Sequence, residues 1–330
     1  MENYQDPEAV ISAIHKSKED ILQELSKCII GQKDVLDLLL IALLAEGHCI
    51  LHGVPGLAKT LIVQSLAKVL DLSFSRIQFT PDLMPADITG TEIIEDRPGK
   101  GKSFSFYKGP IFANIVLADE INRTPPKTQA ALLQAMQEKA VTLYGKTYHL
   151  DLPFFVLATE NPIEQEGTYM LPEAQLDRFL FNIDLDYPSF HEEVQIASRK
   201  TFFSDQKLKK IIGRDELHKY QQFIEKIPIS DKIIEYVVRI VNSTRPQNAT
   251  DSFIKENTAY GAGPRASQNI VIAAKANAAL HGNYSVTKDD IRKVAYPILR
   301  HRIILNFTAI SAKLSTRDVI QHAIGEADRH

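Results

Sequence analysis

The chain has 330 residues, of which 44% are hydrophobic and 24% are charged, and its formal net charge is -3. This length is enough for about two domains, and the composition is ordinary for a globular protein. The slightly negative charge excludes a strongly basic nucleic-acid-binding protein, although a local basic stripe stays open.

Targeting and membrane signals are absent from the sequence pattern. Residues 1–7 are polar, without the basic start and apolar core of a signal peptide. The apolar stretch at residues 35–45 contains Asp37 and is too short to span a bilayer. Cys28 and Cys49 lack the short spacing of a metal site. We therefore expect a cytoplasmic protein with no membrane span.

The first part of the chain predicts two helices and then a strand, a loop and a helix. Apolar residues recur at three- and four-residue steps over residues 7–27 and 32–46. Residues 48–52 form a short apolar run that ends in the glycine-containing loop 53–60, and helical spacing resumes at residues 61–70. This order is typical of a ligand-binding α/β unit.

Two segments in the middle of the chain predict different structures. Residues 74–79 indicate a strand. Residues 80–110 carry four prolines and four glycines, so we expect a long irregular insert, and such segments are usually functional or mobile. Residues 141–152 alternate around Tyr144-Gly145-Lys146, which predicts a hairpin at about residues 141–150.

Further strands and helices complete the predicted fold. Residues 115–118 and 154–158 are continuous apolar runs, as in strands buried on both faces, and residues 179–185 indicate a last strand. Between them, residues 124–139 predict a helix with Thr124 as its cap and Pro125 in its first turn. Beyond Ser189 the predicted helices are residues 190–203, 214–227, 231–244, 264–281 and 288–300.

This alternation predicts a parallel α/β sheet flanked by helices over residues 1–188. An all-helical domain would follow over residues 189–330.

The loop Gly53-Val54-Pro55-Gly56-Leu57-Ala58-Lys59-Thr60 predicts a phosphate-binding site. Backbone N–H groups of such a loop converge on phosphate oxygens, and the next helix adds its positive end. Lys59 would reach the β- and γ-phosphates of ATP, and Thr60 would bind Mg²⁺. The residues expected to contact the nucleotide here are Gly53, Pro55, Gly56, Leu57, Ala58, Lys59, Thr60 and Leu61.

Ala58 departs from this pattern, which has glycine before the lysine. Alanine fits if its backbone is helical, because left-handed φ values disfavour a Cβ atom. The alternative is a glycine turn followed by an accidental Lys-Thr pair.

Asp119 and Glu120 follow the apolar run 115–118, so they would stand at the carboxyl end of a buried strand. Asp119 would hold Mg²⁺, directly or through water. Glu120 would polarise the attacking water as a general base. Adjacent acids are common on surfaces, but their position after a phosphate loop favours this function.

Three more polar residues are candidates for catalysis. Asn161 follows the strand at residues 154–158 and could orient water at the γ-phosphate, although Asn-Pro also favours a simple turn. Arg178 and Arg265 could stabilise the charge of phosphoryl transfer, and a neighbouring subunit can supply such a residue. The alternative for each arginine is a surface salt bridge that contributes little.

The order of these motifs resembles that of AAA+ ATPases, and more closely that of the MoxR family. The resemblance covers roughly residues 8–325. The stretches that carry it are Ile29-Ile30-Gly31-Gln32, Gly53 to Thr60, Gly109-Pro110-Ile111-Phe112-Ala113-Asn114, Leu117-Ala118-Asp119-Glu120-Ile121-Asn122-Arg123, Ala158-Thr159-Glu160-Asn161-Pro162, and Leu171-Pro172-Glu173-Ala174-Gln175-Leu176-Asp177-Arg178-Phe179. Alanine at position 58 is usual in that family.

The resemblance implies functional assignments that spacing alone does not give. Asn161 resembles the sensor-1 residue, Arg178 an arginine finger that acts in trans, and Arg265 the sensor-2 arginine of a lid domain. Ile30 and Gln32 resemble the segment that borders the nucleotide base.

Members of the family resemble hexameric rings that act as chaperone-type motors, often on proteins with von Willebrand factor A domains. The insert, at about residues 84–107, and the hairpin would face the ring pore.

The leading hypothesis is therefore an ATP-hydrolysing motor that remodels protein partners. A nucleic-acid motor is the alternative, because Lys100, Lys102 and Lys108 lie in the insert near Phe104 and Phe106. A nucleotide-gated scaffold would not need the catalytic residues, and a small-molecule kinase would need neither Asn161 nor a helical domain.

Overall fold

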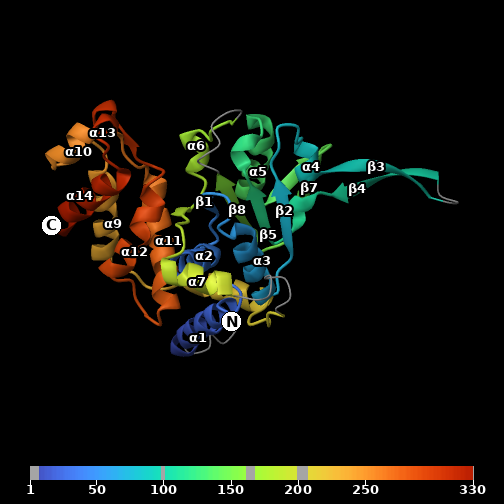
Figure 1. Ribbon diagram of the computed structural model, residues 1–330, viewed down its shortest axis with the longest axis horizontal. Coiled ribbons are helices and arrows are strands. Elements are labelled where there is room, and N and C mark those ends of the chain that lie inside the picture. Colours follow the sequence, from blue (N-terminus) through green and yellow to red (C-terminus); the bar gives the residue numbers. More distant parts are fainter. Residues whose placement is uncertain (1–6, 98–100, 161–167, 199–206, 330) are drawn as a thin grey trace.

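The computed structural model describes residues 7–97, 101–160, 168–198 and 207–329, which form an α/β core and a mainly helical lid (Figure 1). The helices are α1 (Pro7–Leu25), α2 (Lys33–Leu44), α3 (Lys59–Val69), α4 (Pro85–Thr89), α5 (Pro126–Glu138), α6 (Glu173–Leu176), α7 (Phe190–Ser198), α8 (Arg214–Glu225), α9 (Asp231–Ser243), α10 (Ser252–Asn257), α11 (Pro264–Leu280), α12 (Lys288–Leu299), α13 (Phe307–Ser311) and α14 (Thr316–Asp328). The strands are β1 (Cys49–His52), β2 (Phe74–Gln78), β3 (Gly90–Arg97), β4 (Gly101–Lys108), β5 (Ile115–Asp119), β6 (Ala140–Leu143), β7 (Lys146–His149), β8 (Phe155–Glu160), β9 (Phe181–Asp184), β10 (Thr258–Tyr260) and β11 (Ile304–Leu305).

The core is built on a parallel sheet, as predicted. Within the described residues its strand order is β2-β5-β8-β1-β9, and every pairing is parallel. Consequently β8 separates β1 from β5, and all the strands end at one edge. Neighbouring strands lie about 4.8 Å apart, so the ends of β1 and β5 are close enough to share a small ligand.

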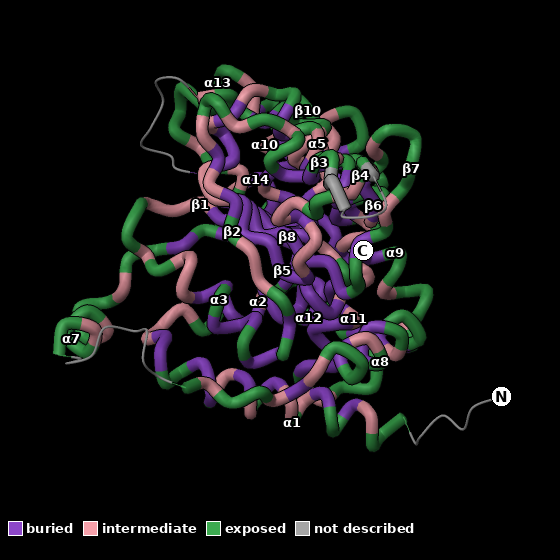
Figure 2. The backbone as a smooth tube through the Cα atoms, turned by 90° about the vertical axis from the view of Figure 1, so that its right-hand side faces the viewer, coloured by how far each residue is buried: buried purple, intermediate pink, exposed green. Residues whose placement is uncertain are grey.

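Successive side chains of the sheet point into two separate apolar layers, as the period of two requires. On one face, Leu117 and Leu157 join a cluster with α1, α2, α3 and the lid helices. On the other face, Val116 and Val156 join a cluster with α4 and α5. Figure 2 shows these strands as the buried centre of the molecule, which explains why they read as unbroken apolar runs.

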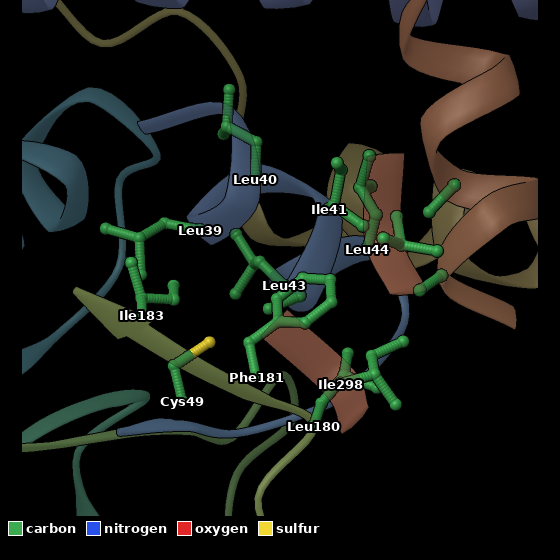
Figure 3. Close-up of a cluster of buried hydrophobic side chains, with 14 of the residues drawn as sticks. Leu39, Leu40, Ile41, Leu43, Leu44, Cys49, Leu180, Phe181, Ile183 and Ile298 are labelled. Atoms are coloured by element: carbon green, nitrogen blue, oxygen red, sulfur yellow. The ribbon is translucent and has the colours of Figure 1, made fainter. Parts of the chain in front are cut away.

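The lid packs onto the first of these layers. Figure 3 shows Leu43 of α2 beside Phe181 of β9, with Ile298 of α12 close by. Helix α1 also joins core and lid, since His15 Nδ1 lies 2.9 Å from the carbonyl oxygen of Leu280 in α11. The predicted boundary at residues 188–189 stays a prediction.

The structure corrects three details of the sequence prediction. The region 80–110 is not irregular, because β3 and β4 form a long antiparallel hairpin that projects from the core (Figure 1). The lid is not all-helical, because β10 and β11 pair as a short ribbon. Thr124 does not cap α5; its hydroxyl donates to the carbonyl of Thr80 at 2.8 Å, and Pro125 is the cap residue.

The hairpin predicted at residues 141–150 is confirmed as β6 and β7. Tyr144 and Gly145 at its turn have φ values of 49° and 79°, as a tight hairpin turn with two left-handed residues requires.

Candidate nucleotide-binding site

The predicted phosphate loop lies at the carboxyl edge of the sheet, between β1 and α3. This is the edge where open α/β sheets bind ligands. A Cβ atom on Gly53 would lie 2.9 Å from Leu185 Cβ and 3.0 Å from its carbonyl oxygen. Gly56 has φ +91°, with open space around it. Glycine is therefore required at position 53 by close packing and at position 56 by backbone conformation.

Ala58 does not have the helical backbone that we expected. Its φ is 58° and its ψ is 26°, which is left-handed. Gln32 and Glu120 share this conformation, each with φ 58°. A left-handed non-glycine residue costs about 1–2 kcal/mol, and such strain is found most often at ligand sites. Three predicted site residues are therefore held in strained backbone.

Lys59 folds back onto its own loop, where its Nζ donates to the carbonyl oxygen of Gly53. Burial lowers the pKa of Lys59, while the nearby Asp119 and Glu120 oppose that shift. The lysine is therefore close to both acids. An entering phosphate would offer Nζ a charged acceptor in place of the carbonyl, which is a stronger hydrogen bond.

The remaining loop residues lie around this lysine. Thr60 and Leu61 are half-buried in the first turn of α3, whose N–H groups have no partners within the helix. Leu57 packs against the apolar core, while Pro55 is exposed. Together they present the positive end of α3 to the loop, as an anion site requires.

Asp119 ends β5 and is anchored from both sides. Arg76 of β2 donates to its Oδ2 through Nε at 3.0 Å and Nη2 at 2.7 Å. Thr159 of β8 donates its hydroxyl to Oδ1 at 2.7 Å. These charge-assisted bonds fix the carboxylate at the sheet edge.

Glu120 follows directly and has its own set of partners. Gln78 Nε2 and Arg123 Nη1 donate to Oε2 at 2.7 Å and 2.9 Å. Its backbone N–H donates to Thr159 Oγ1 at 2.8 Å. Contacts from β2, from β8 and from the turn after β5 therefore fix the position of Glu120.

Sequence reasoning missed Arg76, Gln78, Arg123 and Thr159. Arg76 and Gln78 alternate on β2 and pair in register with Leu117 and Asp119. Residues two apart on a strand share a face. The two polar side chains at positions 76 and 78 could therefore have been predicted to lie together and contact the Asp-Glu pair.

A polar pair lies where β1 runs into the loop, because His52 at the end of β1 is the register partner of Glu160 in β8. His52 Nδ1 is 3.4 Å from Glu160 Oε2, and Asn182 Nδ2 donates to His52 Nε2 at 3.0 Å. Burial raises the pKa of Glu160 to about 7. Burial first, and then the charge of Arg300, lower the pKa of His52 to about 4. The histidine is thus neutral at pH 7, so this contact is not an ion pair there.

Ile30 and Gln32 lie where the chain passes the start of α7. Gln32 Nε2 donates to the carbonyl of Asp186 at 3.0 Å, and Ile30 is half-buried. A cavity of about 490 Å³ adjoins this segment and is lined by residues that include Ile29, Gly31 and Leu36. Asn161, the predicted sensor residue, lies outside the described residues.

Arg178 and Arg265 are brought together, but not at the phosphate loop. Both line a cavity of about 280 Å³ between core and lid, with His48 and Met136 on its core side. Arg265 Nη1 donates to Asp177 Oδ2 at 3.2 Å. The half-buried guanidinium of Arg178 has no hydrogen bond or ion pair with any residue in the described part of the chain.

The strand register places this cavity at the other edge of the sheet. Cys49 pairs with Phe181 and His52 pairs with Asp184, in parallel. The phosphate loop follows His52, whereas Arg178 precedes Phe181. A four-residue strand spans roughly 13 Å. The two arginines therefore lie at the amino edge, away from the loop of their own chain.

Comparisons with known proteins agree with this geometry. The family described as "ATPase family associated with various cellular activities (AAA)" matches residues 48–181, and an AAA lid domain matches residues 251–323. The chaperone MoxR1 of Mycobacterium tuberculosis is 42% identical over 318 residues, which cover 96% of this chain and 83% of that protein. The chain belongs to the MoxR family of AAA+ ATPases.

Two further relatives match this MoxR-family chain over nearly its whole length. The uncharacterized protein YeaC of Bacillus subtilis is 42% identical over 312 residues, covering 93% of this chain and 94% of that protein. The crystal structure of a candidate ATPase from Cytophaga hutchinsonii is 42% identical and has a TM-score of 0.88. The matched residues make up 97% of this chain and 96% of the Cytophaga chain.

Membership of the MoxR family confirms the predicted fold of a P-loop core with a carboxyl-terminal lid, and it confirms ATP hydrolysis. The nucleic-acid motor is not favoured, because the match to MoxR1 covers nearly the whole chain. Within the described residues, no helix is long and apolar enough to cross a membrane.

Proposed function

We propose that this MoxR-family ATPase is a Mg²⁺-dependent motor that remodels protein partners and completes each catalytic site between two subunits of a ring. The separation of Lys59 and Glu120 from Arg178 and Arg265 carries the proposal. These two pairs stand at opposite edges of one sheet. In a head-to-tail ring, the amino edge of one subunit can face the carboxyl edge of the next.

In this proposal, Lys59 and the first turn of α3 hold the phosphates of ATP. Glu120 accepts a proton from the water that attacks the γ-phosphate, and the bond to the departing ADP oxygen breaks. Gln78 and Arg123 keep the carboxylate of Glu120 in place before the water arrives. We assign Asn161 to the γ-phosphate by its position directly after β8.

The residues present fit a magnesium ion that arrives with the nucleotide. The hydroxyl of Thr60 and the carboxylate of Asp119 are hard oxygen ligands, and Mg²⁺ commonly takes one or two protein ligands plus phosphates and water. The described residues hold no cluster of three or more His, Cys, Asp or Glu side chains that could bind a metal alone. Bound Mg²⁺ would neutralise charge on the phosphates.

A protein substrate is supported by the two hairpins. Phe106 of β4 stacks on Tyr148 of β7 with ring centroids 4.2 Å apart, so the hairpins form one unit. Farther out, Ile94 and Phe104 pair across β3 and β4 and are 62% and 73% exposed. Exposed apolar residues of this kind mark contact surfaces.

The identity of MoxR1 as a chaperone supports protein clients for this chain as well. Three further statements are predictions from the family resemblance. The ring is hexameric, with the two hairpins facing its pore; the clients have von Willebrand factor A domains; and the protein is located in the cytoplasm.

The test is the substitution Arg178→Ala. We expect the purified variant to bind ATP as the wild type does, because Arg178 lies far from its own phosphate loop. Turnover should fall by about 10³–10⁵-fold, the usual loss of an arginine finger. Nucleotide titration and steady-state phosphate release measure the two effects.

Mixing with Lys59→Ala tests whether the arginine acts in trans. Each variant alone is inactive, but about a quarter of the interfaces in an equal mixture join an intact loop to an intact arginine. Turnover should therefore return on mixing. Wild-type turnover by Arg178→Ala, or no recovery in the mixture, would contradict the proposal.

A further inference from the structure

Arg302, three residues beyond Leu299 at the end of α12, is buried against the core segment that carries Arg178. Its side chain is 2% exposed. Nε donates to Asp177 Oδ1 at 2.7 Å, and Nη2 donates to the carbonyls of Asp177 at 3.0 Å and Phe179 at 2.7 Å. Nη1 donates to the carbonyl of Leu180 at 3.4 Å. The guanidinium thus spans the backbone on both sides of residue 178.

Two other lid residues reinforce this contact. His301 Nε2 lies 3.2 Å from the carbonyl of Phe179. Arg265 donates to the second carboxylate oxygen of Asp177, so this acid joins two lid arginines. Every one of these bonds links the lid to residues 177–180, and none involves the side chain of Arg178.

The simplest alternative is that Arg302 only fastens the lid to the core. A buried guanidinium is costly unless its donors are satisfied, and burial does lower the pKa of Arg302 against the opposing effect of Asp177. Fastening alone does not explain where the bonds fall. They fix the backbone around Arg178, whose guanidinium has no partner among the described residues and lines the cavity of about 280 Å³.

We propose that Arg302 is a positioning residue that holds Arg178 in place for the nucleotide of the neighbouring subunit, so that lid and finger move together. This inference rests on the proposed function, in which Arg178 acts in trans. Bonds to the backbone on both sides of residue 178 limit where the guanidinium of Arg178 can lie, and its unpaired N–H groups stay available to a phosphate.

The first test is Arg302→Lys, which keeps the charge but loses the planar fork. Nucleotide affinity should stay within about twofold of wild type, while turnover falls on the order of 10²-fold, the loss that a misplacement of about 1 Å can cause. Arg245→Lys is the matched control. Arg245 donates to the carbonyl of Ala262 within the lid, so turnover should change less than about twofold.

Mixing experiments separate positioning from folding. An equal mixture of Arg302→Lys with Lys59→Ala should recover turnover, because the intact finger then comes from the Lys59→Ala subunit. A mixture of Arg302→Lys with Arg178→Ala should not recover, since both variants lack a working finger. Recovery in the second mixture but not in the first would overturn the inference, as would wild-type turnover by Arg302→Lys alone.

Asp177→Asn keeps the test decisive if Arg302→Lys does not fold. Asp177 is 34% exposed at its side chain, and asparagine keeps one acceptor oxygen, so a smaller loss with the same mixing pattern is expected. Rescue of Asp177→Asn by Arg178→Ala would contradict the inference. If Arg178→Ala and Lys59→Ala do not complement each other, the proposed function fails instead.

Discussion

The two edges of the parallel sheet differ in how their charged residues are satisfied. At the carboxyl edge, Asp119 and Glu120 are paired with Arg76 and Arg123, and Lys59 closes onto its own loop. At the amino edge, the carbonyls of Asp177 and Phe179 accept hydrogen bonds from Arg302, but the guanidinium of Arg178 is unpaired among the described residues.

This difference indicates what each edge needs to become active. At the carboxyl edge the charged side chains already have partners within the chain. A bound nucleotide must therefore replace some of these partners with its phosphate oxygens. The amino edge offers an unused cation on a rigid backbone, which suits an anion brought from outside the chain. The comparison therefore favours catalysis shared between subunits over catalysis within one chain.

Glu120→Gln should have the largest effect at the carboxyl edge. The amide cannot act as a general base, so we expect turnover to fall by about 10²–10⁴-fold while ATP still binds. The matched control is Glu235→Gln on α9, whose carboxylate pairs with the exposed Arg239. Phosphate release and nucleotide titration measure the two properties.

Mixing experiments then test whether Glu120 acts on the nucleotide held by Lys59 of its own subunit. Glu120→Gln should recover turnover with Arg178→Ala and fail to recover with Lys59→Ala, because loop and base come from the same subunit. The opposite pattern would break the comparison between the two edges.

Glu160→Gln should change how the stability of the protein depends on pH. The pKa of Glu160 is raised to about 7 by burial, so the folded state holds its proton more tightly than the unfolded state, whose carboxyl has the usual value of 4.5. The protonated form contributes stability that is fully present below pH 4.5 and is lost as pH rises through 7. Glutamine, which stays neutral, removes this loss.

We therefore expect Glu160→Gln to be more stable than wild type by up to about 3 kcal/mol at pH 8, with the difference shrinking towards pH 5. Denaturant titrations across this range measure it. The exposed Glu173→Gln serves as the control. A difference that does not depend on pH would show that the carboxyl of Glu160 titrates normally.

The parallel sheet could be predicted because its central strands, such as β5 and β8, are buried on both faces and have apolar sequences. The hairpin of β3 and β4 could not be predicted, because the prolines and glycines of residues 80–110 indicate a loop and the exposed strands carry a mixed pattern. Ile94 opposite Phe104 is a tertiary pairing that local periodicity does not reveal.

The site was predicted where chemistry follows local order and missed where it depends on distant contacts. Lys59, Asp119 and Glu120 each follow a strand, so the sequence indicates their common edge. Arg302 and Asp177 are 125 residues apart, and no local pattern indicates that a lid arginine bonds this segment.

Ala58→Gly should have the smallest effect and tests the strain at the carboxyl edge. Alanine at φ 58° carries about 1–2 kcal/mol of strain, which glycine relieves. Glycine also adds about 0.4–1 kcal/mol of unfolded-chain entropy. The net change should be between zero and about 1.6 kcal/mol of added stability, measured by the midpoint of chemical unfolding.

A matched alanine gives the opposite sign. Ala130 is exposed within α5, so Ala130→Gly should cost about 1 kcal/mol. If Ala58→Gly costs as much, then residue 58 is helical in solution and the phosphate loop is relaxed. If it stabilises the protein, the carboxyl edge keeps strained backbone for the sake of its ligand. The amino edge would then differ, since the backbone on either side of Arg178 is held by hydrogen bonds from Arg302 of the lid.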